Sequence, residues 1–267
     1  MVYYSLYLLE SFYFLMLFGM ENHRFSQAVA TYDRYSDVQQ AAGISLIDQI
    51  QTSSPHTILD FGCGTGALTH RLAEAFPEAM VLGVDISPAM VAYAAAHHPH
   101  DRVQYITLDR WSLDSRWDVV FSNACLQWVL DDTESSWRLM DQLVAAAQQE
   151  LVCSVLTCDT GQALQSVLEG LDWGVSIPAQ HFLNRRLLSH RFLHYYQFDK
   201  VWGHQYLKRF DSVVSMLRHF KFSGTTVSHS HQFQWTRRHI TQLKDVFYDI
   251  FGDVRYEYSF IMGSFSR

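Results

Sequence analysis

A glycine-rich run in the first third of the chain carries the residues whose types and spacing point most directly to chemistry. It reads Asp60-Phe61-Gly62-Cys63-Gly64-Thr65-Gly66, and Asp85 follows Gly62 by 23 residues. Glycines let a backbone turn sharply and approach a ligand closely. An acid at the end of the next strand can accept hydrogen bonds from both hydroxyls of a ribose. The loop and the acid together predict a nucleoside ligand rather than a merely tight turn.

Short apolar runs alternate with helical patterns from residue 57 to about 158, and these elements must position the loop and the acid. We predict strands at residues 57–61, 80–85, 103–107, 117–121 and 151–156. Helices are predicted at residues 67–76, at 89–98 after an N-cap at Ser87, and around Trp137–Val144 after a cap at Asp131 or Asp132. Such alternation implies βαβ units, and therefore a parallel sheet with right-handed crossovers.

The segments that flank this region do not alternate regularly between strand and helix patterns. Residues 38–50 predict an amphipathic helix, and residues 236–251 predict another that ends at Gly252. Residues 255–264 alternate as a terminal strand, expected to belong to an antiparallel pair. The stretch at about 160–235 is rich in Arg, His, Phe and Tyr and is longer than a connecting loop needs to be. We expect an α/β fold in which this stretch is an insertion after the fifth strand that caps the site.

Composition narrows the class of protein. The chain has 267 residues, of which 48% are hydrophobic and 18% charged, so it can bury a large core and is not disordered. Its net charge of −7 argues against general nucleic-acid binding. The four cysteines, Cys63, Cys125, Cys153 and Cys158, show no Cys-x-x-Cys spacing and no secretory signal accompanies them. They predict free thiols in a reducing cytoplasm.

The first nineteen residues form a hydrophobic, aromatic leader. Glu10 lies at the centre of this stretch and no Lys or Arg precedes it, which opposes both a spanning helix and a signal peptide. Three interpretations stay open: a membrane anchor, an amphipathic segment packed on the body, or residues translated upstream of the natural start. We favour the third, because a polar, globular-looking sequence begins at Met20. The fold is then expected to comprise residues 20–267, without membrane association.

The glycine run resembles motif I of the class I S-adenosylmethionine-dependent methyltransferases, because its glycines are spaced G-x-G-x-G and an acid, Asp60, precedes them. Asp85 looks like that family's motif II acid, Leu108-Asp109-Arg110 stands where the family contacts adenine, and Ser122–Trp128 stands where substrate meets methyl donor. The resemblance implies a Rossmann-like sheet, parallel except for an antiparallel terminal strand, with helices on both faces and S-adenosylmethionine bound. The cofactor-binding residues that it implies are Asp60, Gly62, Cys63, Gly64, Gly66, Asp85, Ile86, Asp109, Arg110 and Asn123. The family's Pro-Gly-Gly turn before strand five is replaced by Ala147-Gln148-Gln149-Glu150.

A narrower resemblance extends to the N-terminal helix and the predicted cap. Phe25-Ser26-Gln27-Ala28, with Tyr32-Asp33 and Gln39, is similar to the N-terminal pattern of the malonyl-acyl-carrier-protein O-methyltransferases of biotin synthesis (the BioC family). The runs Asn123–Trp128 and Leu217–Thr226 also look like segments of that family. The resemblance implies methylation of the free carboxyl of malonyl-acyl-carrier protein, which gives the malonyl methyl ester that starts pimeloyl synthesis.

Methyl transfer to a carboxylate requires no general base, because the acceptor is already ionised at pH 7. We therefore expect alignment and water exclusion to do the catalysis, with Tyr32 and Trp128 as walls or hydrogen-bond donors near the transferred methyl. Ordinary packing is the alternative for both residues. Gln180-His181-Phe182 stands where the family often shows Asn-Arg-Phe. The residues expected to contact the substrate or the carrier protein are Gln127, His181, Arg185, Arg186, Arg218 and Lys221.

Charge is distributed unevenly along the chain. Residues 181–221 hold eight Lys or Arg against two acids, which is +6 in a chain of net charge −7. A basic cap on an acidic body would steer an acidic partner to one face, and acyl carrier proteins are strongly acidic. This fits the acyl carrier protein as partner, while solvated helix faces without a partner are the alternative.

Two histidine clusters, His97-His98-Pro99-His100 and His229-Ser230-His231, could suggest a metal site. Neither has Cys or acidic partners at ligand spacing, so we expect no metal. Two other interpretations of the chain stay open. One is a methyltransferase of another small acceptor, such as a free dicarboxylic acid or a quinone. The other is a non-catalytic module that binds a nucleoside or a partner protein, which the intact Asp60, glycines and Asp85 oppose.

Overall fold

The computed structural model describes residues 26–112, 114–225 and 233–267. The hydrophobic leader, Phe25, Thr226 and the second histidine cluster lie outside the described residues. The strands are β1 (Thr57–Phe61), β2 (Met80–Asp85), β3 (Val103–Thr107), β4 (Trp117–Asn123), β5 (Ala147–Leu156), β6 (Lys200–Phe210) and β7 (Val254–Ser266). The α-helices are α2 (Asp37–Ile47), α3 (Ala67–Ala75), α4 (Pro88–His97), α5 (Arg138–Ala146), α6 (Gln162–Leu171), α7 (Arg185–His190), α8 (Val213–Phe222) and α9 (Arg237–Phe251). Residues 26–35 are also helical. Short 3₁₀ helices are η1 (Leu108–Arg110), η2 (Leu126–Trp128) and η3 (Pro178–His181), and η4 (Arg191–Tyr195) is a π-helical turn.

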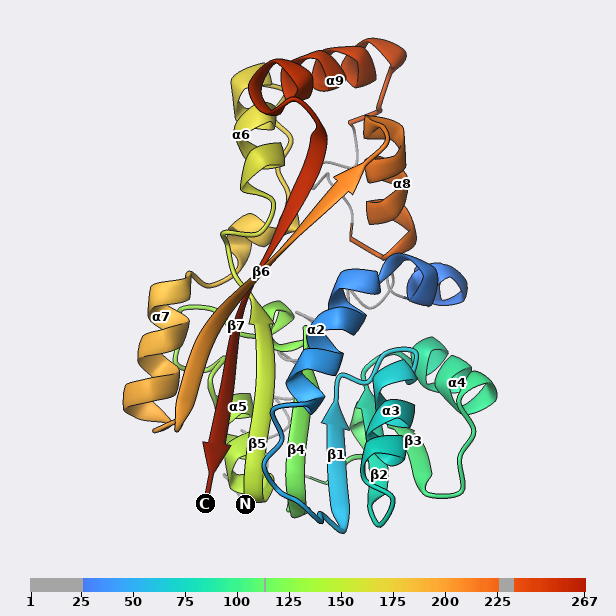
Figure 1. Ribbon diagram of the computed structural model, residues 1–267, viewed down its shortest axis with the longest axis vertical. Helices are drawn as coiled ribbons and strands as arrows, with labels where there is room; N and C mark the ends of the chain where they lie inside the picture. The colour runs from blue at the N-terminus through green and yellow to red at the C-terminus, as the bar shows by residue number, and fades with distance from the viewer. Residues whose placement is uncertain (1–25, 113, 226–232) are drawn as a thin grey trace, which may run out of the picture.

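All seven strands join one sheet in the order β3-β2-β1-β4-β5-β7-β6 (Figure 1). The pairs among β1 to β5 are parallel, and β7 is antiparallel to both of its neighbours, β5 and β6. The Rossmann-like sheet with an antiparallel terminal strand is thereby confirmed. The strand order places the carboxyl end of β1 between those of β2 and β4, and ligands of open parallel sheets bind at such an edge.

Alternate residues of each strand face opposite layers of helices, as the pleat of a strand requires. In β4, Val119 and Phe121 pack in a buried cluster with residues of α2, α3, α6, α8 and α9. Val120, between them, packs in a second cluster with residues of α5 and α7. The long strands β6 and β7 extend beyond the carboxyl ends of β4 and β5, and α6, α8 and α9 surround that extension (Figure 1).

The predicted strand bounds agree with the structure at β1, β2 and β3, and the terminal strand, predicted at 255–264, is one residue longer at its start and two at its end. The bounds of β4 and β5 also differ. The β4 strand continues two residues further, to Asn123, and β5 begins four residues earlier, at Ala147. The residues that replace the Pro-Gly-Gly turn are therefore part of a strand. Of the segment expected to be an insertion, the eleven residues of β6 lie in the sheet itself, paired with β7.

The predicted cap of α5 at Asp131 or Asp132 is wrong. The helix begins at Arg138, with Trp137 at the N-cap position. Asp131 instead accepts the N–H of Thr133 at 2.8 Å, and its carbonyl accepts the indole N–H of Trp137 at 3.0 Å. The aspartate closes a local turn, a use that competes with helix capping.

In the part of the chain that the structure describes, no helix is both long and apolar enough to cross a membrane.

Candidate functional site

The glycine loop connects β1 to α3 through three residues with positive φ. Gly62, Gly64 and Gly66 have φ of 80°, 53° and 84°, a region that L side chains rarely adopt. A Cβ on Gly62 would lie 2.3 Å from the Sγ of Cys125, and one on Gly66 would lie 2.8 Å from the Cβ of Ala94. A Cβ on Gly64 would meet nothing within 4 Å. Two of the glycines therefore permit close packing, and the middle one faces open space where a ligand can approach.

Asp85 holds this loop against the end of β2. Its Oδ2 accepts the N–H of Gly64 at 2.9 Å, and its Oδ1 accepts the N–H of Ser87 at 2.8 Å. The N–H groups of Gly62 and Cys63 both donate to the carbonyl of Val84, at 2.8 and 3.0 Å. The structure thus brings together the loop and the acid that the sequence pattern paired.

Asp60 is buried beneath the loop, with 2% of its surface exposed. Thr69 donates to its Oδ2 at 2.6 Å. Burial raises the pKa of Asp60 to about 7, although the Thr69 bond lowers it, and the charge of Asp85 raises it further. Burial also raises the pKa of Asp85, against the lowering effect of its backbone N–H donors. Two buried acids that resist ionisation suit a ligand with positive charge, which would favour their charged forms.

The other predicted cofactor residues lie along the same edge. Ile86 follows Asp85 directly, and Cys63 is buried in the loop, where desolvation raises the pKa of its thiol. Asp109 and Arg110 are exposed in η1, immediately after β3, whose Thr107 pairs with Asp85. The structure adds Trp111, which was not predicted. Its ring packs edge-on against Phe61 at 5.6 Å, and its buried indole N–H has no hydrogen-bond partner among the described residues.

The helix of residues 26–35 is fastened to this edge by hydroxyl contacts. The Oγ atoms of Ser26 and Ser87 lie 2.8 Å apart, and Thr65 of the glycine loop donates to Asp33. These contacts place Tyr32 beside the loop. Burial raises the pKa of Tyr32 far above its ordinary value, and the charges of Asp85 and Asp33 raise it further. The phenol therefore stays protonated and can donate a hydrogen bond.

The end of β4 is braced internally. Asn123 donates from Nδ2 to the carbonyl of Gln39 at 3.0 Å and accepts from the Oγ of Ser154 at 2.7 Å. Gln127, which is 5% exposed, donates from Nε2 to the carbonyl of Ala124 at 2.6 Å. The hydrogen bonds of both side chains therefore fix the conformation of the segment that follows β4. Trp128 meets the ring of Phe182 edge-on at a centroid distance of 5.0 Å.

A small pocket lies beyond this segment, under the extension of β7. Its lining comprises Tyr32, Gln39, Ala124, Gln127, Trp128, Leu156, Thr160, Pro178, Ala179, Phe182, Phe220, Ser223, Thr225, Tyr256 and Tyr258. We call it the acceptor cavity. Tyr32, Trp128 and Gln127 were predicted from the sequence. The described residues of the lining include hydroxyl and amide groups but no Lys, Arg or His.

Behind the acceptor cavity, Tyr258 is bonded to a buried histidine. The Nε2 of His219 lies 2.7 Å from the Tyr258 hydroxyl. Burial lowers the pKa of His219 to about 4, and the nearby charge of Lys208 lowers it further. The imidazole is therefore neutral at pH 7. The sequence offered no signal for this pair, because its members are 39 residues apart in different elements.

Comparison with known proteins agrees with this geometry. Residues 59–147 match the family model of a methyltransferase domain. The chain is 40% identical over 153 residues to the malonyl-[acyl-carrier protein] O-methyltransferase of Hahella chejuensis, an alignment covering 56% of this chain and 54% of that protein. In both comparisons the chain is thus similar to methyltransferases. The alignment spans about half the length of that relative.

Two further comparisons cover more of the chain. It is 26% identical over 238 residues, or 87% of each chain, to malonyl-[acyl-carrier protein] O-methyltransferase 1 of Ilyobacter polytropus. The solved structure of phosphoethanolamine N-methyltransferase 2 of Haemonchus contortus, in complex with S-adenosyl-L-methionine, matches with a TM-score of 0.52 at 14% identity. That match covers 91% of this chain and 57% of the other, and it shows the shared fold.

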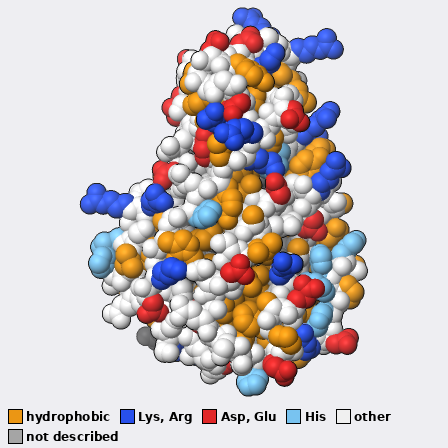
Figure 2. All heavy atoms as spheres, in the orientation of Figure 1, with side chains coloured by type: hydrophobic (Ala, Val, Ile, Leu, Met, Phe, Trp, Pro, Cys, Tyr) orange, Lys and Arg blue, Asp and Glu red, His pale blue; other side chains and the backbone are white. Residues whose placement is uncertain are grey.

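The cations of the predicted basic face do not form one surface in the structure. Four of its eight cations contact partners within the protein: Lys208 with Asp37, Arg191 with Glu134, Arg209 with Asp253 and Lys200 with Gln49. Arg185 and Arg186 begin α7, and a Cβ on Gly203 would lie 1.7 Å from the Nη2 of Arg185. Arg218 and Lys221 lie on the solvent-exposed side of α8. Figure 2 shows Lys and Arg side chains near the start of α7 on one edge and over α8 on the opposite edge.

None of the predicted substrate cations lines the acceptor cavity, as far as the structure describes it. His181 is exposed at the end of η3, one residue before the lining residue Phe182. Sequence reasoning located the cations by counting charges along the chain. It missed the hydroxyl-bearing residues of β7 and of the end of α8, for which no local motif exists.

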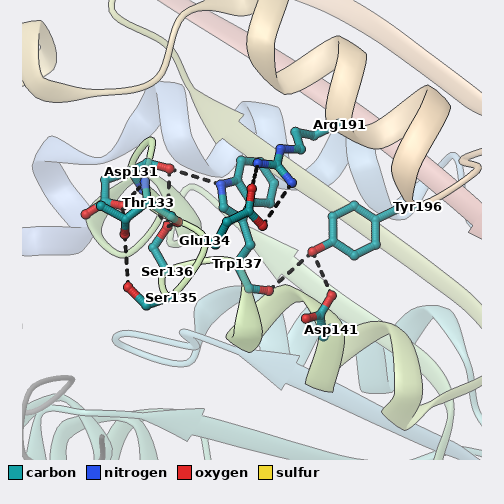
Figure 3. A network of polar contacts seen from close by, with 9 residues as sticks. All are labelled: Asp131, Thr133, Glu134, Ser135, Ser136, Trp137, Asp141, Arg191 and Tyr196. Atoms are coloured by element: carbon teal, nitrogen blue, oxygen red, sulfur yellow. Dashed lines mark hydrogen bonds and ion pairs between the residues drawn. The ribbon is translucent and has the colours of Figure 1, made fainter.

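Arg191 contacts residues that follow Trp128 in the chain (Figure 3). It pairs with Glu134, and its guanidinium carbon lies 5.1 Å from the centre of the Trp137 ring. The nearby Tyr196 donates from its hydroxyl to the Oδ1 of Asp141 at 3.0 Å. These contacts bind the π-helical turn to the segment that follows Trp128, so the wall of the acceptor cavity is anchored from behind.

The first histidine cluster lies near the glycine loop. The ring of His70 is 5.8 Å from that of His98 and 5.6 Å from that of His100. Within the described ranges, no group of three His, Cys, Asp or Glu is placed to hold a metal ion.

Proposed function

We propose that this methyltransferase transfers a methyl group from S-adenosylmethionine to the free carboxyl of malonyl carried by acyl carrier protein, giving the methyl ester that starts pimeloyl synthesis. The residues proposed to hold the methyl donor are those of the glycine loop with Asp60, Asp85, Ile86, Asp109, Arg110 and Asn123. The donor supplies a methyl group bound to a positively charged sulfur. Buried Asp60 and Asp85 suit such a cation, and the open space at Gly64 lets a ligand reach the backbone.

The observation that carries the proposal is the acceptor cavity at the same sheet edge. Tyr32 lies beside the glycine loop and also lines the cavity, so the two sites share a wall. Relatives named malonyl-[acyl-carrier protein] O-methyltransferase in Hahella chejuensis and Ilyobacter polytropus support the choice of acceptor.

The lining of the cavity suits a carboxylate that is already ionised. The Tyr32 hydroxyl can donate a hydrogen bond to it without a cation that would neutralise its charge. The hydroxyls of Ser223 and Thr225 bond to each other, and Ser223 also donates to the carbonyl of Phe220. The nucleophilic oxygen thus keeps its charge, while the aromatic walls exclude water and fix its direction of approach. His219, with its pKa lowered to about 4, is a weak base and is already bonded to Tyr258. Among the lining residues that the structure describes, none is a His, Lys, Asp or Glu that could take a proton from a phenolic acceptor.

The acyl carrier protein is the proposed partner. Arg185 and Arg186 begin α7, three residues after the cavity residue Phe182, and an acidic carrier could approach this pair. Arg218 and Lys221, on the outside of α8, form a second proposed contact.

The experiment that tests the proposal measures methyl transfer to malonyl-acyl-carrier protein, malonyl-coenzyme A and free malonate. We expect the carrier-bound substrate to have the highest kcat/KM. Asp85→Ala should weaken S-adenosylhomocysteine binding by about 10- to 100-fold, the usual effect of losing charge-assisted hydrogen bonds. Asp101→Ala, at an exposed acid before β3, is the matched control and should bind normally. No thermal shift of the wild type at millimolar S-adenosylhomocysteine would overturn the proposed methyl donor. Binding without methylation of any malonyl substrate would overturn the acceptor.

A further inference from the structure

A second hollow lies on the outer side of the acceptor cavity, between α6 and η3. Its empty volume is about 550 Å³ and it is open to solvent. Its lining comprises Cys158, Thr160, Gln162, Gln165, Ser166, Glu169, Ile177 and Gln180. We call it the glutamine groove, because three of these eight residues are glutamines.

The glutamine groove and the acceptor cavity share a thin wall. Thr160 lines both. Residues 177–180 line both: the outer two, Ile177 and Gln180, line the groove, and the two between them, Pro178 and Ala179, line the cavity. The Thr160 hydroxyl oxygen accepts the N–H of Ser259 at 3.1 Å, which holds the shared residue against β7. A chain lying in the groove therefore ends at the edge of the cavity.

The groove is polar, and its amide groups are held in place. Glu169 accepts from the Nε2 of Gln165 at 2.8 Å and from that of Gln180 at 3.3 Å. The Oε1 of Gln165 accepts the N–H of Ile177 at 3.3 Å. Glu169 is the one charged residue among the lining residues described, so the groove disfavours an anionic ligand. Amide and hydroxyl groups with fixed orientations suit a neutral ligand that carries amides of its own.

We propose that the glutamine groove binds the uncharged, amide-bearing arm through which a thioester substrate presents its carboxyl to the acceptor cavity. This inference rests on the proposed function, because it assumes that the acceptor is tethered. The arm's far end, and the carrier that holds it, would remain outside α6 and η3.

The test fills the groove without touching the cavity. Ser166 is exposed on α6 and lines the groove, so Ser166→Trp adds bulk there at little risk to the fold. Gly170→Trp is the matched control on the same helix, because Gly170 does not line the groove and a Cβ there meets nothing within 4 Å. Methylation is measured for malonyl thioesters with arms of increasing length: S-methyl, N-acetylcysteamine, pantetheine and acyl carrier protein.

The wild type is expected to show a kcat/KM that rises at least tenfold from the S-methyl ester to the pantetheine ester. Ser166→Trp should abolish most of that rise and leave the S-methyl ester and S-adenosylhomocysteine binding unchanged, whereas Gly170→Trp should behave like the wild type. Gln165→Leu, which removes an amide without adding bulk, should lower the pantetheine value about fivefold. An equal rise in Ser166→Trp, or no dependence on arm length in an active wild type, would overturn the groove and leave the proposed function standing. Failure of the wild type to methylate any malonyl thioester would overturn both.

Discussion

Asp60 should give this protein a stability that decreases as the pH rises. Its pKa is raised by burial to about 7, against 3.8 for an unperturbed aspartate. Between these two values the folded state holds a proton that the unfolded chain has released, so folding is favoured most at low pH and less as pH rises. Above pH 7 both states are ionised and the loss is complete. The free energy of unfolding falls by about 4 kcal/mol in total, and about 2–3 kcal/mol of that fall occurs between pH 5 and pH 8.

Asp60→Asn removes this titration and keeps an oxygen that can accept the Thr69 hydroxyl. The free energy of unfolding of the variant, measured by urea denaturation relative to the wild type, should therefore rise by about 2–3 kcal/mol between pH 5 and pH 8. Asp85 titrates in both proteins, so its contribution largely cancels in the difference. The comparison is made without cofactor, because a bound cation would itself favour the ionised acid.

Asp118→Asn is the control, because it removes a carboxylate that stays ionised throughout this pH range. Partial burial raises the pKa of Asp118, but hydrogen bonds from the N–H groups of His56 and Thr57 and from Gln149 outweigh it, and the net pKa is lowered. The stability that Asp118 contributes is present above its ordinary pKa of 3.8 and is lost only as the pH falls below that value. The difference in unfolding free energy between Asp118→Asn and the wild type should therefore be the same at pH 5 and at pH 8. A pH-independent difference between Asp60→Asn and the wild type would refute the assignment of a protonated, buried Asp60.

Three further results are expected. Gly66→Ala should lower the free energy of unfolding by about 2–5 kcal/mol, because it adds both backbone strain and overpacking. Gly64→Ala should lower it by about 1–2 kcal/mol, from backbone strain alone. Equal losses in urea titrations would contradict the packing argument. Tyr196→Phe removes the hydroxyl bonded to Asp141 and should cost about 1 kcal/mol in the same assay, and an unchanged urea midpoint would show that the bond adds nothing. The pKa of His219 is lowered to about 4, so its contribution to stability is present above pH 6.5 and is lost as the pH falls toward 4. His219→Gln should therefore reduce the fall in unfolding free energy between pH 6.5 and pH 4. A fall as steep as that of the wild type would exclude His219 as its source.

The glycine loop and its acid could be predicted because both the signal and the structure are local. Gly62, Gly64 and Gly66 all take the positive φ that their residue type suggested, and Asp85 reaches back to Gly64 across two adjacent parallel strands. The strands β1, β2 and β3 begin and end at the predicted residues, since each is a short apolar run that ends in a loop.

The start of β5 could not be predicted, because it depends on contacts distant in sequence. Glu150 is 1% exposed, and its carboxylate accepts the N–H groups of Gln51 and Thr52 at 2.9 Å. Ser264 of β7 also donates to it, at 3.2 Å. A glutamate in a polar run indicates a surface turn unless such partners are known, and here they lie about a hundred residues away in either direction. Polar residues become strand residues when distant donors satisfy them.

The acceptor cavity was the hardest part to predict, since its wall is assembled from the N-terminal helix, η2, η3, α8 and β7. Charge counting suggested that a cation would meet the substrate, but the described lining is neutral and the cations lie on outer surfaces. Under the proposed function, the neutral lining has an electrostatic explanation. A carboxylate entering a neutral cavity beside Asp60 and Asp85 is repelled once those acids are ionised, and a cationic methyl donor against them removes the repulsion. The cavity therefore needs no arginine: the positive charge that attracts the acceptor is the one that the reaction consumes, and a fixed protein cation would only weaken the nucleophile.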